Sequence, residues 1–305
     1  MTPVPDFASD RTSGSTDVGR AFLSDLERWI ATDTSSSAPA LRQALLSRLR
    51  AAQDAQPSMA LVHQLAARAL EVADAGVRRG DPPVELRTHL AHSCAAERDD
   101  LESSTRAVVT QAQALLSESE SWIATLSASR AVEDAILAAH RAGLAPRVVV
   151  AEGRPNFEGR AMARALAAAG VPVWLVVDAA LPLLLSPARM LWIGADAVTD
   201  HGVLNKVGSY AAALAAREHS VPVYALTTRR KFLPSSTAAL RIVEQPPAEV
   251  WDSPANGVRP RNVYFELVPL PLFRGIVVED AVLGLSESAT LARERPLPDE
   301  LAGAP

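Results

Sequence analysis

The chain has 305 residues, 48% of them hydrophobic and 21% charged, which is enough to bury one large core or two smaller ones. A formal net charge of −5 gives no indication of the basic surface that nucleic-acid binding needs, and a single cysteine, Cys94, excludes a disulfide within the chain. No leader pattern opens the chain, and no apolar run reaches the roughly 18 residues that span a bilayer. We therefore expect a cytoplasmic protein without nucleic-acid or membrane partners.

Helical periodicity dominates the first 120 residues, where apolar side chains recur three and four positions apart. Val18, Phe22 and Leu26, for example, fall on one stripe of a helix. Breakers rich in Ser, Pro and Gly separate this helix from the next ones. The sequence predicts an N-terminal helical domain over residues 1–120, with helices at 18–31, 39–53, 58–76 and 84–119.

The pattern changes after residue 120, where short apolar runs rich in β-branched residues alternate with helical patterns. Such alternation predicts a parallel sheet with crossover helices, and runs without polar positions are typical of strands covered on both faces. We therefore predict an α/β fold, in which the helical domain is followed by a Rossmann-like domain over residues 121–305 that carries most of the site. Strands are expected at 122–127, 147–152, 172–178, 189–196 and 221–226, and helices at 129–143, 158–170 and 204–220.

Charged side chains gather where the predicted strands end. Arg154, Asp178 and Asp196 follow three of the strands, and Lys231 follows a fourth. Because the carboxyl ends of parallel strands lie along one edge of a sheet, where ligands bind, we expect these side chains to be neighbours. The sequence thus predicts a ligand site at this edge.

The stretch GADAVTDHGVLNKVGS at residues 194–209 carries the most chemistry. It places Asn205 and Lys206 at the start of a predicted helix, where free N–H groups and the helix dipole favour an anion. Arg154, Lys206 and Lys231 would hold a phosphate, and the Asp196 carboxylate would move a proton at a hydroxyl-bearing carbon. This set of groups suits a phosphorylated sugar.

Each of these residues also has a purely structural interpretation. Asp178 and Asp196 are suited to capping the turns after their strands, the Asn-Lys pair to a solvated helix start, and Arg154 to an extended dipeptide before proline. Glu158 is typical of a first helical turn. No HExxH, GxGxxG or Walker-type motif is present, so we expect no cofactor and no metal.

Taken together, parts of the sequence resemble one protein family. It contains the alpha, beta and delta regulatory subunits of translation initiation factor 2B, and the isomerases that act on methylthioribose 1-phosphate and ribose 1,5-bisphosphate. The resemblance implies at least a homodimer, for which we expect the apolar run 262–273 to form the interface. The segments that carry the family resemblance are IATLSASRAV (123–132), VVVAEGRPNFEGRAMARAL (148–166), GADAVTDHGVLNKVGSYAAALAAREHSVPVYAL (194–226) and NVYFELVP (262–269).

The resemblance also implies roles for single residues. In the isomerases a Cys and an Asp convert an aldose 1-phosphate into a 1-phospho-ketose; the Asp is Asp196 here, but Ser127 stands where the Cys is expected. The phosphate-binding Arg-Gly-Ala element corresponds to Ser13-Gly14-Ser15, so Gly14 is retained while its arginine is missing, and Arg11 is a candidate substitute. His201 also replaces an asparagine that is usual in the third segment.

Three functions therefore stay open at this point. The first is a sugar-phosphate isomerase that uses Asp196 and Ser127. The second is a regulatory protein that binds a sugar phosphate or a nucleotide without catalysis, which the absence of the thiol favours, because a serine hydroxyl needs an activating base. The third is a scaffold subunit acting in translation.

Overall fold

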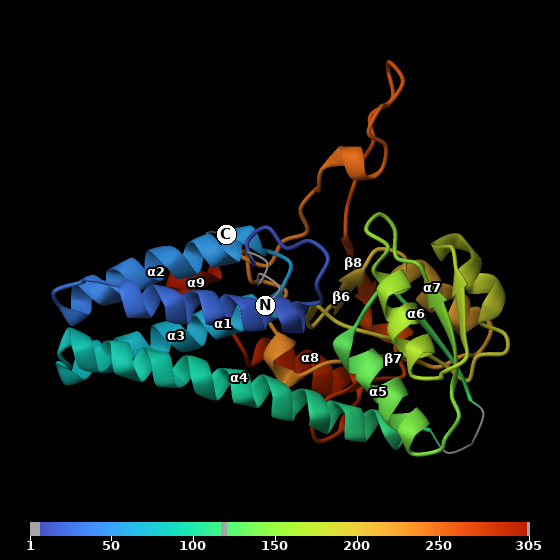
Figure 1. Ribbon diagram of the computed structural model, residues 1–305, viewed down its shortest axis with the longest axis horizontal. Helices are drawn as coiled ribbons and strands as arrows, with labels where there is room; N and C mark the ends of the chain where they lie inside the picture. The colour runs from blue at the N-terminus through green and yellow to red at the C-terminus, as the bar shows by residue number, and fades with distance from the viewer. Residues whose placement is uncertain (1–6, 117–120, 304–305) are drawn as a thin grey trace.

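A bundle of four long helices forms the N-terminal part of the computed structural model, which describes residues 7–116 and 121–303. The bundle is the elongated blue-to-teal half of the molecule in Figure 1. Residues 7–116 contain no strand, in agreement with their helical periodicity, and the stripe residues Val18, Phe22 and Leu26 are fully buried. The helices span Ser15–Thr32 (α1), Ala38–Ala55 (α2), Ala60–Arg79 (α3) and Pro83–Gln113 (α4).

A seven-stranded sheet in the order β10-β9-β7-β4-β1-β2-β3 forms the second part. Neighbouring strands run parallel except β10, which is antiparallel to β9, so the predicted α/β class is confirmed. The chain winds outward in one direction from β1 and in the other from β4, so the order reverses between these two strands. The bounds are Trp122–Leu126 (β1), Arg147–Ala151 (β2), Val173–Val176 (β3), Met190–Ile193 (β4), Val223–Leu226 (β7), Gly275–Val277 (β9) and Val282–Leu283 (β10).

Helices cover both faces of this sheet, and strand side chains alternate between the two resulting cores. Along β4, Leu191 and Ile193 pack in one core, whereas Met190 and Trp192 pack in the other. The first core lies under η1 (Asp178–Leu184), α7 (Ser209–Glu218) and α8 (Leu285–Arg293). The second lies under α5 (Arg130–Arg141), α6 (Glu158–Ala168) and the end of α4.

A small antiparallel sheet, β5-β6-β8, replaces the predicted start of one helix. The expectation of a helix from Leu204 is wrong: residues 202–206 pair with β8, and α7 begins only after Gly208, whose φ is 101°. Gly202 allows residues 202–206 to lie close against β8. A Cβ at this position would be 2.4 Å from the Val268 carbonyl oxygen, a contact that only glycine permits. The strands span Ala197–Val198 (β5), Gly202–Lys206 (β6) and Phe265–Pro269 (β8).

The apolar run 262–273 is largely used within the chain rather than left for a partner. Its middle is strand β8, and Leu270, Leu272 and Phe273 are buried in the core on the sheet. Val263 and Leu267 are its large apolar side chains that stay exposed, at 36% and 41%. The structure therefore gives this run an internal packing role that its composition did not reveal.

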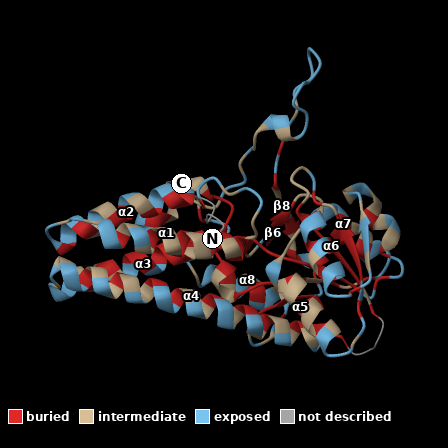
Figure 2. Cartoon of the chain, viewed as in Figure 1, coloured by how far each residue is buried: buried red, intermediate tan, exposed pale blue. Residues whose placement is uncertain are grey.

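The two parts of the chain share a core near the C-terminus. Leu297 and Leu301, the latter on α9 (Asp299–Ala302), pack with the helices of the N-terminal bundle. Figure 2 shows in red the residues buried between the helices of that bundle. The expected boundary near residue 120 falls at 117–120, outside the described residues, so the division into domains 1–120 and 121–305 stays a proposal. Within the described part, no helix is long and apolar enough to cross a membrane.

Candidate functional site

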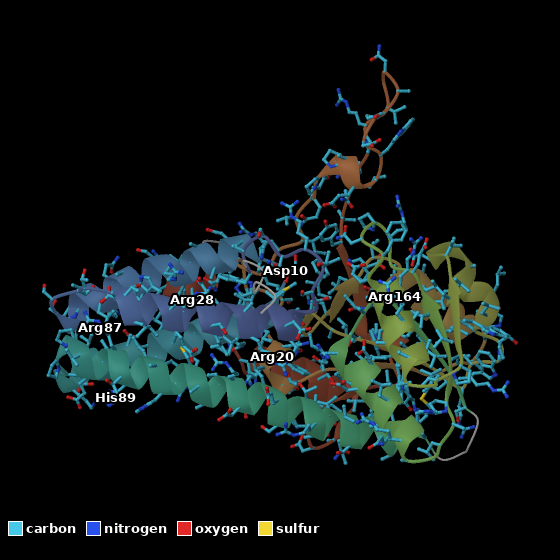
Figure 3. All side chains as sticks on the ribbon, in the orientation of Figure 1. Asp10, Arg20, Arg28, Arg87, His89 and Arg164 are labelled. Atoms are coloured by element: carbon cyan, nitrogen blue, oxygen red, sulfur yellow. The ribbon has the colours of Figure 1, made fainter. Side chains whose placement is uncertain are left out.

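A cavity of about 210 Å³ lies between the helical bundle and the carboxyl-end edge of the large sheet. The N-terminal loop around Asp10, at the junction of the two parts in Figure 3, forms one wall. The loops after β1 and β4 form another, at the point where the strand order reverses and where doubly wound sheets bind ligands. The arm 241–262, which projects in orange in Figure 1, closes a third side with its base. The cavity thus occupies the edge that the sequence predicted.

Ser127 enters the cavity directly after β1. It adopts φ 58°, in the left-handed region, and its N–H donates to the Ala151 carbonyl oxygen at 3.2 Å. The neighbouring loop after β4 approaches closely, since a Cβ on Gly194 would lie 2.7 Å from Ser129 Oγ. Ser127 is 5% exposed, and its backbone conformation and its hydrogen bond to Ala151 fix its position.

Asp196 lines the same cavity from the loop after β4. Its carbonyl oxygen accepts a hydrogen bond from the Ala60 N–H at 2.9 Å, which ties the site to the first residue of α3. Burial raises the pKa of its carboxyl to about 6, although the nearby Lys231 and Lys206 and a hydrogen bond from Ser15 act to lower it. A carboxyl with such a pKa can give and take protons near neutrality.

Asn205 and Lys206 also line the cavity, but from strand β6 instead of a helix start. The Asn205 amide donates to Ser209 Oγ at 2.9 Å. Lys206 Nζ donates to Glu158 Oε1 at 2.6 Å and lies 4.8 Å from the ring centre of Tyr264. The charge of Lys206 is therefore balanced by a buried carboxylate. The predicted helix start at these residues is wrong, whereas a role of Asn205 and Lys206 in binding a phosphate stays a proposal.

Lys231 lies behind Asp196 and lines a much smaller cavity of about 30 Å³. Its Nζ donates to the Ala195 carbonyl oxygen at 3.0 Å. Burial lowers the pKa of Lys231, an effect that the carboxylate of Asp196 partly opposes. Lys231 therefore interacts electrostatically with Asp196 and does not line the main cavity.

Arg154 is not brought to the cavity. Its guanidinium lies 4.9 Å from the ring centre of Phe157 and donates to the Val250 carbonyl oxygen at 3.4 Å, on the exposed side of the loop. Asp178 explains this outward course, because its carboxylate accepts the backbone N–H groups of Gly153 and Arg154, both at 2.8 Å. The prediction that Arg154 converges with Asp196 is wrong. Asp178 does not cap the turn after its own strand, as the structural interpretation expected, but holds the loop that follows β2.

Two helix N-termini face the site. Gly14 precedes α1 and lines both cavities, and Ser129 precedes α5 and lines both as well. Among the described residues, neither helix has a side-chain cap, so their first N–H groups are available to an anion. Arg11 lines the main cavity, where its guanidinium lies 3.8 Å from the Glu249 carboxylate.

Glu158 is the site residue that sequence reasoning assigned only to a helix turn. It does lie in the first turn of α6, but its side chain is buried and reaches the cavity wall beside Lys206. The available signal was its place at the start of the helix that follows the predicted strand 147–152. Sequence spacing did not reveal that the carboxylate points to the cavity and away from solvent.

The geometry is that of an α/β protein with a small polar cavity at the strand-order reversal, bordered by a protonatable carboxyl. Residues 11–283 match the Initiation factor 2 subunit family, and the chain belongs to this family. The putative translation initiation factor eIF-2B subunit 2-like protein of Pyrococcus furiosus is 34% identical over 172 residues, 56% of this chain and 60% of that protein.

Similar proteins include an enzyme as well. The methylthioribose-1-phosphate isomerase of Synechococcus sp. (strain CC9902) is 34% identical over 165 residues, 48% of each chain. The chain thus spans about half the length of the curated relatives it matches. The crystal structure of translation initiation factor eIF-2B from Pyrococcus horikoshii OT3 has a TM-score of 0.78 at 24% identity, covering 92% of this chain and 94% of that one, which shows the shared fold.

Proposed function

We propose that the protein binds a phosphorylated sugar in the main cavity and isomerises an aldose 1-phosphate to a ketose, with Asp196 as acid and base. The observation that carries this proposal is the buried carboxyl of Asp196, whose pKa of about 6 suits proton transfer near neutrality. Isomerases of sugar phosphates are among the relatives of the chain, which supports the same reaction class.

The size and polarity of the cavity support a small anionic ligand. A volume of about 210 Å³ is below the roughly 300–1,000 Å³ of pockets for drug-sized ligands, and so suits a pentose phosphate. The N-termini of α1 and α5, at Gly14 and Ser129, are suited to the phosphate, because N–H groups and the helix dipole attract an anion. Arg11 is placed on the same wall and would supply a further positive charge.

The proposal is tested by incubating the protein with a panel of aldose 1-phosphates and following ketose formation by NMR. We expect turnover of one of them, a pH profile with an apparent pKa near 6, and loss of turnover in Asp196→Asn with binding retained. Calorimetry on the same panel reports binding separately. An absence of both binding and turnover would rule out the site as proposed.

A second candidate is a regulatory protein that binds the sugar phosphate or a nucleotide without converting it. Ser127 favours this alternative, since a hydroxyl replaces the thiol that the resemblance implies. The expected result is then binding by calorimetry in both the native protein and Asp196→Asn, with no ketose formed.

We further propose that the protein is a cytoplasmic homo-oligomer. Light scattering would test the oligomeric state against a mass of 32.3 kDa for one chain.

A further inference from the structure

We propose that Glu158 is the base that activates Ser127, so that the Ser127–Glu158 pair takes the place of the missing thiol. This inference rests on the proposed function, because it assigns a chemical role within the same cavity. A serine hydroxyl exchanges protons near neutral pH only when a base lies beside it. The structure provides such a base beside Ser127 in the carboxylate of Glu158, which lies on α6, more than thirty residues later in the chain.

The position of Glu158 is set by close backbone packing. Gly159, the next residue, lies so near β2 that a Cβ would be 2.0 Å from the Ala151 carbonyl oxygen. Phe157, just before it, has φ 60°, which turns the chain sharply into α6. The first turn of α6 is therefore pressed against the end of β2, whose last carbonyl also accepts the Ser127 N–H.

One carboxylate oxygen of Glu158 is paired and the other is not. Oε1 accepts from Lys206 Nζ at 2.6 Å, and both side chains are buried. Oε2 is buried without a hydrogen-bond partner among the described residues. A buried acceptor left without a donor is unfavourable, so a donor for Oε2 is expected in the working state.

Ser127 is the neighbour that can supply this donor. A Cβ built on Gly153 would lie 3.0 Å from Glu158 Oε2 and 3.3 Å from Ser127 Cβ, so both groups border the same small space. Both residues also line the main cavity. Rotation of the hydroxyl, together with a small adjustment of the carboxylate, would bring Ser127 Oγ and Oε2 into hydrogen-bond contact. Such contacts are often long in ligand-free sites and tighten on binding.

The chemistry is a proton relay that conserves protons over a cycle. Ser127 Oγ takes a proton from the sugar while its own hydroxyl proton passes to Glu158 Oε2, and the reverse transfers return a proton to the product. Lys206 keeps Oε1 occupied and holds the carboxylate in place. Asp196 also lines this cavity, and the relay leaves its carboxyl for a second proton transfer.

The test places a thiol at position 127 as a reporter of its surroundings. In Ser127→Cys we would measure the pH dependence of alkylation of the introduced thiol, since buried Cys94, with a pKa of about 12, reacts slowly. A neighbouring carboxylate raises a thiol pKa. Adding Glu158→Gln should therefore lower the pKa of the introduced thiol by about one unit or more. Gln keeps the side-chain shape and an acceptor for Lys206, and Glu158→Asp, which draws the charge back, should give an intermediate pKa.

Glu152→Gln is the matched control, because Glu152 forms a salt bridge of the same 2.6 Å length with Arg160 but does not line the cavity. It should leave the thiol pKa unchanged. An unchanged thiol pKa in Glu158→Gln would overturn the Ser127–Glu158 pair, whatever the protein catalyses. Where turnover exists, Glu158→Gln should reduce it on the order of 100-fold with Ser at position 127 and far less with Cys there. Equal losses in both backgrounds would also overturn the pair, whereas absence of turnover in the native protein counts only against the isomerase proposal.

Discussion

Asp178 Oδ1 accepts a hydrogen bond from the Gly153 N–H at 2.8 Å, across the gap between two neighbouring strand ends. The second carboxylate oxygen accepts the next N–H in the loop. One side chain thus holds the loop that delivers Glu158 to the cavity. The candidate site depends on this remote carboxylate as well as on the residues that line it.

Asp178→Ala should destabilise the protein by about 1–3 kcal/mol, since it leaves two backbone N–H groups without their charged acceptor. Asp178→Asn should cost less, because its amide oxygen can still accept one of them. Urea unfolding measures both values. Asp252→Ala, at an exposed position on the projecting arm, serves as the control and should have little effect. Equal stabilities of all three variants would contradict the role of Asp178.

Asp196→Asn should change how stability depends on pH. The folded-state pKa of about 6 lies above the ordinary 3.8, so the native state holds the proton more tightly, and stability falls as pH rises through this window. Ionisation of this carboxyl between pH 4 and pH 7 therefore lowers the free energy of unfolding of the native protein by at most about 3 kcal/mol. Asn removes this dependence, so the variant should gain stability relative to the native protein as pH rises. Because the carboxylate also neutralises Lys231, the gain should stay below that limit. Urea unfolding from pH 4 to 7 measures it, and parallel curves for both proteins would refute the shift.

His63 should give the opposite pH dependence in the same window. Burial lowers the pKa of His63 from 6.5 to about 4, so the unfolded chain binds the proton more tightly and stability falls as pH drops from 6.5 to 4. The ring is held neutral, with Nδ1 receiving a hydrogen bond from Gln53 at 2.9 Å and Nε2 lying 3.1 Å from the Pro57 carbonyl oxygen.

His63→Gln should therefore lose stability at pH 7, where the hydrogen bonds are lost, but lose less on acidification than the native protein. In the native protein, protonation of His63 lowers the free energy of unfolding by up to about 3 kcal/mol at pH 4, and the variant lacks this loss. Because His63 and Asp196 act with opposite signs, the native protein should show little net change from these two groups between pH 4 and 6. A His63→Gln variant as acid-sensitive as the native protein would show that His63 is not the titrating group.

Ser127→Cys should raise isomerase turnover on the aldose 1-phosphate that the native protein accepts. Even with its pKa raised by the neighbouring Glu158 carboxylate, a thiol exchanges protons more readily near neutrality than a serine hydroxyl. We expect an increase on the order of ten-fold or more, followed by NMR detection of ketose. Ser103→Cys, at an exposed position on α4 that does not line the cavity, is the control for introducing a thiol elsewhere. If neither variant forms ketose while the sugar phosphate still binds, the regulatory alternative is favoured.

Much of the architecture follows from the sequence by itself, because it depends on local periodicity. The stripe of Val18, Phe22 and Leu26 identifies a helix, and the apolar runs at 147–152 and 189–196 identify buried strands, irrespective of the rest of the chain. The shared edge of parallel strands then brings Ser127 and Asp196 together, since topology alone places both at the carboxyl ends of β1 and β4.

Only the tertiary structure decided the orientation of side chains and the pairing of the second sheet. Asn205 and Lys206 appear helical in sequence, but pairing of β6 with β8, some sixty residues later, keeps them extended. Arg154 turns outward because Asp178 holds its backbone, and Glu158 turns inward because its glycine neighbour packs on β2. These choices rest on long-range contacts between segments whose sequence separation hides their proximity, and local propensity carries no information about them.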